Sequence, residues 1–114
     1  MKEIKAYVRT NMAEPVVEAL GAQGCHDFSL VEVRRVMKGL APESQDFSVM
    51  LGGAFERMIK IEIVCRDEST PRLVEAIRKA ATTGRPGDGK IFVSSVEEAV
   101  RIASAQRGDA ALSI

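Results

Sequence analysis

Three glycines and two basic residues lie close together in the segment 83–90, which reads Thr-Gly-Arg-Pro-Gly-Asp-Gly-Lys. Glycine lets backbone N–H groups approach an anion closely, and Arg85 and Lys90 add positive charge. The segment therefore predicts a loop that could hold a phosphate group. A purely structural alternative is a helix C-cap at Gly84 followed by a tight turn at the Asp-Gly pair.

The segment also has the G-x-x-x-x-G-K spacing of a P-loop, from Gly84 to Lys90. Ile91, however, stands where a P-loop needs Ser or Thr to bind magnesium. The segment is also expected to leave a helix and enter a strand, which is the reverse of the P-loop order. We therefore reject a Walker-type nucleotide hydrolase.

A second group with chemical potential is the run of Cys25, His26 and Asp27, which places a thiol, an imidazole and a carboxylate side by side. These groups could contact a metal ion, although a loop after a helix is the better explanation of the run. The other cysteine, Cys65, is expected in the core, and two distant cysteines indicate reduced thiols. Three methionines are further soft ligands, but methionine more often fills cores or loops: Met37, Met50 and Met58.

The sequence contains no recognisable catalytic centre. His26 is the only histidine, neither cysteine has an evident activating partner, and no carboxylates cluster as in a two-metal site. We therefore expect a binding protein and not an enzyme.

The elements that position these residues begin with a strand–helix–strand unit. Apolar and charged residues alternate over 4–9, which is the period of a half-buried strand. Apolar residues recur at helical spacing over 14–23, and Gly21 and Gly24 mark the expected helix end. The Leu- and Val-rich segment 28–37 predicts the second strand.

The pattern then repeats. Residues 58–65 alternate most clearly and predict a strand. Thr70 as N-cap and Pro71 at the first helical position predict a helix that ends near Gly84, and residues 90–94 predict the last strand.

The remaining C-terminal segment, 95–114, begins with a second helix signal. Ser95 and Glu98 have the spacing of a capping box, which predicts a short helix through about Ile102.

Two consecutive strand–helix–strand units predict an α/β (α+β) fold of the ferredoxin-like βαββαβ type, a four-stranded antiparallel sheet with two helices on one face. The chain of 114 residues, 46% of them hydrophobic, suits a single domain, 1–114. Because Ile61 and Ile63 alternate with Val64, the sheet has apolar residues on both faces, and we expect it to pack in an oligomer.

Charge and hydropathy exclude several classes of partner. The chain carries 16 Lys and Arg against 16 Asp and Glu, so a basic nucleic-acid surface is not expected. No apolar run reaches the length of a membrane span and no signal peptide is recognisable, which predicts a cytoplasmic protein without direct membrane insertion.

The connection between the second and third predicted strands, about residues 38–55, is longer than usual. Its glycines and polar residues suggest mobility, and long loops on compact scaffolds often carry function. A disordered insertion without a role is the alternative.

Together these features resemble the PII signal-transduction family. The similarity lies in the strand 60–64, the loop and strand 83–93, the Val-Arg-Ile of 100–102, and the Glu32-Val33 pair. The resemblance implies a homotrimer that binds an adenine nucleotide (ATP, ADP or AMP) between subunits. In that family the segment 83–90 is the B-loop, which holds phosphates. The T-loop, here about 38–55, responds to the ligand and contacts a protein target such as a membrane transporter.

The resemblance also implies a set of nucleotide-binding residues. Val64 matches the strand position whose backbone lies near the base, and Ser29 keeps the hydroxyl of the family's usual threonine. The full set is Ser29, Lys38, Val64, Thr83, Gly84, Arg85, Gly87, Asp88, Gly89, Lys90 and Arg101.

Several positions depart from the family. Met37, Lys38 and Gly39 replace a glycine, an arginine and a glutamine, Ala103 replaces an arginine, and Met58 replaces a lysine that often faces the phosphates or 2-oxoglutarate. Each lost charge-assisted hydrogen bond is worth about 1.5–3 kcal/mol, so triphosphate binding should be weakened.

Two further consequences follow from the departures. Leu51 occupies the position of the tyrosine that is uridylylated in typical bacterial members, so this modification is not expected. Alternatively, a trimer of this kind could sense a metal ion, bicarbonate or another nucleotide, as related metal-tolerance proteins suggest.

Overall fold

The computed structural model describes residues 1–36 and 55–114 of the chain. Most of the predicted T-loop, including Lys38, lies outside the described residues. The strands are β1 (Lys2–Arg9), β2 (Ser29–Val36), β3 (Phe55–Cys65) and β4 (Gly89–Ser95), and the helices are α1 (Ala13–Ala22) and α3 (Thr70–Ala81). Three short 3-10 helices cover Thr10–Met12, Asp67–Ser69 and Gly108–Ala111.

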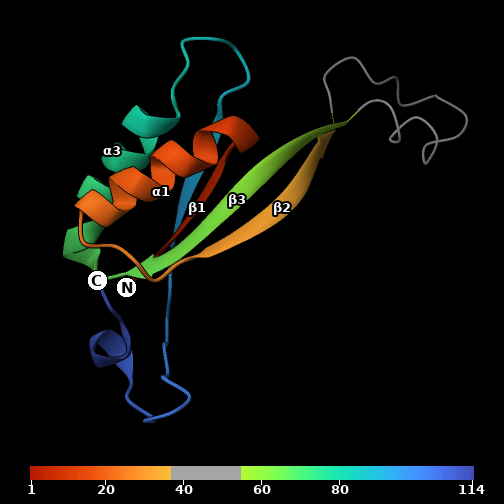
Figure 1. The fold of residues 1–114 in the computed structure, drawn as a ribbon. Helices are drawn as coiled ribbons and strands as arrows, with labels where there is room; N and C mark the ends of the chain where they lie inside the picture. Colours follow the sequence, from red (N-terminus) through yellow and green to blue (C-terminus); the bar gives the residue numbers. More distant parts are fainter. Residues whose placement is uncertain (37–54) are drawn as a thin grey trace, which may run out of the picture.

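The four strands form one antiparallel sheet in the order β2-β3-β1-β4. Ile4 in β1 lies opposite Ile63 of β3 and Val93 of β4. Both helices pack on the same face of the sheet (Figure 1). This arrangement is the ferredoxin-like α+β fold, as the sequence predicted.

The core lies between the helices and the sheet because alternate strand residues and one stripe of each helix are apolar. Among the described residues, the largest buried side chains of this layer are Ile4, Val8, Val16, Leu20, Ile61, Ile63, Leu73 and Ile77. The opposite face of the sheet, called the open face below, carries no helix of the described residues.

The two predicted helices form with small differences at their ends. Gly21 lies inside α1, and Gly24, with a φ of 79°, follows it. Ser69 occupies the N-cap position of α3, so the prediction of Thr70 as N-cap is wrong. The Thr70 hydroxyl instead donates a hydrogen bond to the carbonyl of Arg66 at 3.1 Å. The helix α3 ends at Ala81, before Gly84.

The short helix predicted after Ser95 is wrong. The Ser95 hydroxyl accepts a hydrogen bond from Lys2 Nζ at 3.0 Å, and the Glu98 carboxylate pairs with Arg107, so neither side chain caps a helix. Residues 99–108 instead form a hairpin-like turn closed by an isolated bridge between Val100 and Arg107. This segment, called the C-terminal hairpin below, projects from one end of the molecule (Figure 1).

The chain after the hairpin returns to the core. The backbone N–H of Arg66 donates to the carbonyl of Ile114 at 2.9 Å, and the Ile114 side chain is buried. Arg66 also donates from its guanidinium to the carbonyl of Asp109 at 3.0 Å.

Within residues 1–36 and 55–114, none of the helices has the length and the apolar character needed to cross a membrane.

Candidate functional site

The B-loop, 83–90, connects α3 to β4 and is organised by Asp88. Its carboxylate accepts hydrogen bonds from the Thr83 hydroxyl, from the Thr83 backbone N–H at 2.8 Å and from Arg9 Nε at 3.0 Å. These bonds, those from Thr83 first, lower the pKa of Asp88 well below its usual range. The carboxylate therefore stays ionised and holds both ends of the loop together.

Two glycines of the B-loop lie in close contact with neighbouring groups, and at Gly89 a side chain would not fit. A Cβ on Gly89 would lie 1.8 Å from the carbonyl oxygen of Tyr7, and the φ of Gly89 is 113°. A Cβ on Gly87 would lie 3.2 Å from a guanidinium nitrogen of Arg35 and 3.3 Å from one of Arg9. The loop backbone is thus pressed against β1, with two guanidinium groups beside it.

A pocket of about 440 Å³ lies beside the B-loop, within the range of small-molecule sites. Apolar side chains from four strands contribute to its wall: Tyr7, Val33, Met58 and Phe92. All four alternate out of phase with the core residues of their strands, so they belong to the open face. The polar part of the wall comes from Arg34, Arg35, Gly87, Asp88, Gly89 and Lys90.

Sequence reasoning missed Arg35, which lines this pocket, and the neighbouring Arg9 and Glu56, which contact the B-loop or Arg35. Arg35 lies directly opposite Glu56 in the β2–β3 pairing, forms an ion pair with it, and donates from Nη1 to the carbonyl of Gly87 at 3.1 Å. Arg9 donates from Nη2 to the carbonyl of Pro86 at 2.7 Å and lies 3.6 Å from the Glu56 carboxylate. Strand alternation places these side chains on the open face, but the pairing of Arg35 with Glu56 crosses the long connection and is not evident from the sequence.

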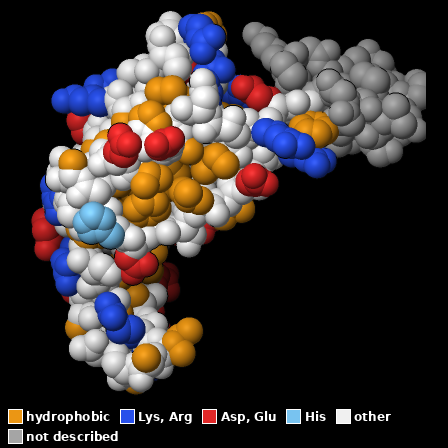
Figure 2. Space-filling view, in the orientation of Figure 1, with side chains coloured by type: hydrophobic (Ala, Val, Ile, Leu, Met, Phe, Trp, Pro, Cys, Tyr) orange, Lys and Arg blue, Asp and Glu red, His pale blue; other side chains and the backbone are white. Residues whose placement is uncertain are grey.

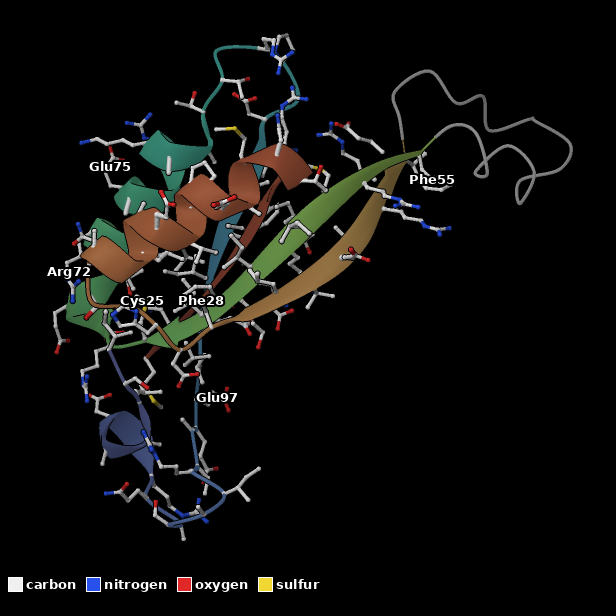
Figure 3. The ribbon with its side chains drawn as sticks, viewed as in Figure 1. Cys25, Phe28, Phe55, Arg72, Glu75 and Glu97 are labelled. Carbon is white, nitrogen blue, oxygen red and sulfur yellow. The ribbon has the colours of Figure 1, made fainter. Side chains whose placement is uncertain are left out.

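Beside the pocket, the edge of the sheet carries a cation–π contact. The guanidinium carbon of Arg34 lies 4.4 Å from the ring centroid of Phe55, at the start of β3 (Figure 3). The contact joins the last part of β2 to the start of β3.

The remaining predicted site residues that the structure describes lie at or beyond the other end of the sheet. Ser29 pairs with Glu62, two residues from Val64 along β3. Lys90 lies opposite Tyr7, which lies opposite Lys60, so Val64 is about 13 Å further along the strand direction. Arg101 belongs to the C-terminal hairpin, which projects from the end opposite the B-loop (Figure 1). One chain therefore brings Thr83 to Lys90 together but keeps them apart from Ser29, Val64 and Arg101.

Apolar side chains are exposed on the open face and on the C-terminal hairpin. Phe92 is 54% exposed and contacts Tyr7 edge-to-face, with ring centroids 6.0 Å apart. Ile102 is fully exposed and Val100 is 45% exposed. Figure 2 shows hydrophobic side chains at the surface of the projecting segment. Exposed aromatic and aliphatic groups of this kind are typical of protein–protein contact surfaces.

The run of Cys25, His26 and Asp27 does not form a joint site in the structure. Cys25 lies below α1 near Phe28 (Figure 3), is 1% exposed, and has a pKa raised mainly by burial. His26 is exposed, and the Asp27 carboxylate accepts a hydrogen bond from Ser113 at 2.9 Å. Among the described residues, no three His, Cys, Asp or Glu side chains are grouped to hold a metal ion.

Comparison with known proteins identifies the relatives of this chain. The family model "Nitrogen regulatory protein P-II" matches residues 1–106. The chain is 41% identical to nitrogen regulatory protein P-II 2 of Methanothermobacter thermautotrophicus, over 98% of this chain and 97% of that protein. It is 38% identical to nitrogen regulatory protein P-II of Bradyrhizobium diazoefficiens, over 95% and 96%, and 37% identical to that of Rhodospirillum rubrum, over 98% and 100%.

The matched residues include all four strands, α1, α3 and the segment 83–90. The family model matches nearly the whole chain, and the relatives share 37–41% of their residues with it over nearly their full length. The chain belongs to the nitrogen regulatory protein P-II family, and it is a signal-transduction regulator and not an enzyme.

Proposed function

We propose that this P-II family member binds an adenine nucleotide in clefts between the subunits of a cytoplasmic homotrimer. Residues 1–114 act as one domain, and the T-loop contacts a target enzyme or transporter in response to the ligand. The observation that carries the proposal is the separation of the predicted ligand residues into two groups at opposite ends of the sheet. If the B-loop end of one copy lies beside the opposite end of a second copy, both groups of ligand residues line one cleft.

The pocket beside the B-loop provides the phosphate end of this cleft. Lys90 contributes an ammonium group, and the glycine-rich backbone offers N–H donors, the combination that suits a phosphate. Tyr7, Met58 and Phe92 form an apolar wall on one side of this pocket. This asymmetry favours a ligand with one charged and one aromatic end.

The other end of the sheet provides the base end from a neighbouring copy. Ser29 and Val64 lie near one another on the open face, where a planar base could stack and accept or donate hydrogen bonds. Arg101 lies on a hairpin that projects beyond the body of its own subunit. The exposed Val100 and Ile102 on the same hairpin would be covered by that neighbour.

Nucleotides with fewer phosphates suit the pocket better than ATP. Met58, which replaces a lysine of typical members, is 2% exposed and lies in the wall of the pocket. A buried thioether offers no charge to a third phosphate. We therefore expect ADP or AMP to bind at least as tightly as ATP.

The test is calorimetric titration of the purified protein with ATP, ADP, AMP and cyclic AMP, with and without magnesium and 2-oxoglutarate. Saturable binding is expected, and Lys90→Ala should weaken it about tenfold or more because a charge-assisted hydrogen bond is lost. Lys79→Ala, which removes a lysine from the exposed surface of α3, is the matched control and should leave the dissociation constant unchanged. Failure of every nucleotide to bind the wild-type protein would refute the proposal.

A further inference from the structure

The B-loop and the pocket beside it are surrounded by more charge than the predicted site residues alone provide. Arg9 and Arg35 both reach the B-loop, and Glu56 lies between them. Met58 is the direct partner of Arg9 in β1 and of Val33 in β2. Two guanidinium groups therefore lie around the position where the typical family lysine is missing.

The contacts of Arg35 are of a kind that a ligand can replace. Its guanidinium donates to the carbonyl of Gly87 and to the carboxylate of Glu56, and the side chain is 36% exposed, so it borders the pocket without being enclosed. A guanidinium has five N–H donors in a planar fork, which matches the oxygens of a phosphate as well as those of a carboxylate. A phosphate in the pocket would therefore compete with Glu56 for the same donors.

Glu56 would keep one cationic partner, Arg9, if its ion pair with Arg35 were broken. Its other carboxylate oxygen lies 3.6 Å from Arg9 Nη1, and Arg9 is held by Asp88 and by the carbonyl of Pro86. When Arg35 turns to a ligand, Glu56 keeps the Arg9 contact, so no carboxylate is left unpaired. The exchange costs one charged contact and forms another.

We propose that Arg35 is a phosphate-binding residue of this chain and that Glu56 competes with the ligand for it. The inference rests on the proposed nucleotide site and deepens it by naming a cation that takes over from the missing lysine at position 58. Glu56 then sets the affinity for the terminal phosphate, and the ligand class is a nucleoside mono- or diphosphate.

The test compares the dissociation constants of ADP and adenosine, measured by calorimetry, for the wild type, Arg35→Gln and Glu56→Gln. Arg35→Gln should weaken ADP binding about tenfold or more, because a charge-assisted contact is lost. Glu56→Gln should strengthen ADP binding several-fold, because the amide competes less well for the guanidinium. Adenosine carries no phosphate, so its affinity should change in neither variant.

Matched controls separate this role from a general effect on charge or folding. Arg72→Gln and Glu75→Gln change a cation near the start of α3, at the end away from the B-loop, and a carboxylate in the middle of that helix (Figure 3), and both should leave ADP binding unchanged. Circular dichroism and thermal unfolding of each variant establish that the fold is retained. Loss of adenosine binding in Arg35→Gln would indicate a structural role and overturn the assignment.

The outcomes distinguish the inference from the proposed function. Equal ADP binding by the wild type and Arg35→Gln, or weaker binding by Glu56→Gln, would refute the role of Arg35 and Glu56 while leaving the nucleotide site intact. If neither the wild type nor Glu56→Gln binds ADP, the nucleotide site is refuted, and the role of Arg35 with it.

Discussion

At the scale of single residues, Asp88 organises the B-loop through its hydrogen bonds to Thr83 and Arg9. The similarity to the P-II family identified Asp88 as a site residue, but the hydrogen bonds in the structure go to Thr83 and Arg9 of the same chain. The glycines that predict close backbone approach do provide it, at Gly87 and Gly89. Arg35 and Glu56 were missed, because the register of β2 against β3 across residues 37–54 depends on the packed sheet and not on a local pattern.

The lowered pKa of Asp88 predicts how stability depends on pH. The folded-state pKa lies below the unfolded value of about 3.9. The ionised carboxylate therefore stabilises the fold above about pH 4, and this contribution is lost as the pH falls towards the folded-state pKa. Asp88→Asn should be less stable than the wild type at pH 7, and the difference should shrink below about pH 4.

Urea unfolding followed by circular dichroism, from pH 7 down to pH 3, measures this difference. Glu97→Gln is the control, since Glu97 is an exposed carboxylate after β4 (Figure 3), and its effect on the free energy of unfolding should be small. A deficit in Asp88→Asn that is as large at pH 3 as at pH 7 would contradict the assigned role.

At the scale of elements, the spacing of apolar residues predicted the strands correctly, but both predictions of helix-capping residues were wrong. Alternation over 4–9 and 58–65 predicted β1 and most of β3, because one face of each strand meets the helices. The capping box at Ser95 and Glu98 failed because Lys2, which is distant in sequence, binds Ser95, and Arg107, across the C-terminal hairpin, binds Glu98. A capping box is a local signal, and partners that only the tertiary fold brings near can override it.

Two glycine substitutions at element ends should have opposite effects. Gly89→Ala places a Cβ against the Tyr7 carbonyl at a φ that alanine avoids, and should destabilise the fold by about 3 kcal/mol or more. Gly21→Ala lies inside α1, where a Cβ would meet only the His26 ring at 3.5 Å, and should stabilise the fold by about 0.5–1 kcal/mol. Thermal and urea unfolding measure both effects, and a stabilising Gly89→Ala would show that the B-loop is not pressed against β1.

At the scale of the whole molecule, the described residues leave apolar side chains exposed on the open face and on the C-terminal hairpin. The sequence predicted apolar residues on both faces of the sheet, and the structure has Phe92 exposed on the open face and Ile102 on the hairpin. The hairpin was not predicted, because the spacing of Ser95 and Glu98 indicated a helix and no local pattern indicated the pairing of Val100 with Arg107. Its projection carries Arg101 away from the B-loop of its own chain.

The intersubunit site makes a prediction about mixed oligomers. Lys90→Ala and Arg101→Ala should each weaken nucleotide binding, since each removes a cation from every cleft. When the two variants are unfolded, mixed and refolded together, some clefts should combine Lys90 from one chain with Arg101 from another and regain wild-type affinity. Calorimetry of the mixture measures the fraction of restored sites. A mixture as weak as its two components would place both residues in the same chain's site.

The separation of Lys90 from Arg101 within one chain has a consequence for how the regulator responds in the cell. On the proposed arrangement, a ligand that bridges two chains binds the assembled form and not the isolated chain, so mass action links nucleotide occupancy to protein concentration. Dilution should lower the apparent affinity for the nucleotide, and saturating nucleotide should slow the exchange of chains between oligomers. The abundance of the protein would then act as a second input alongside the nucleotide.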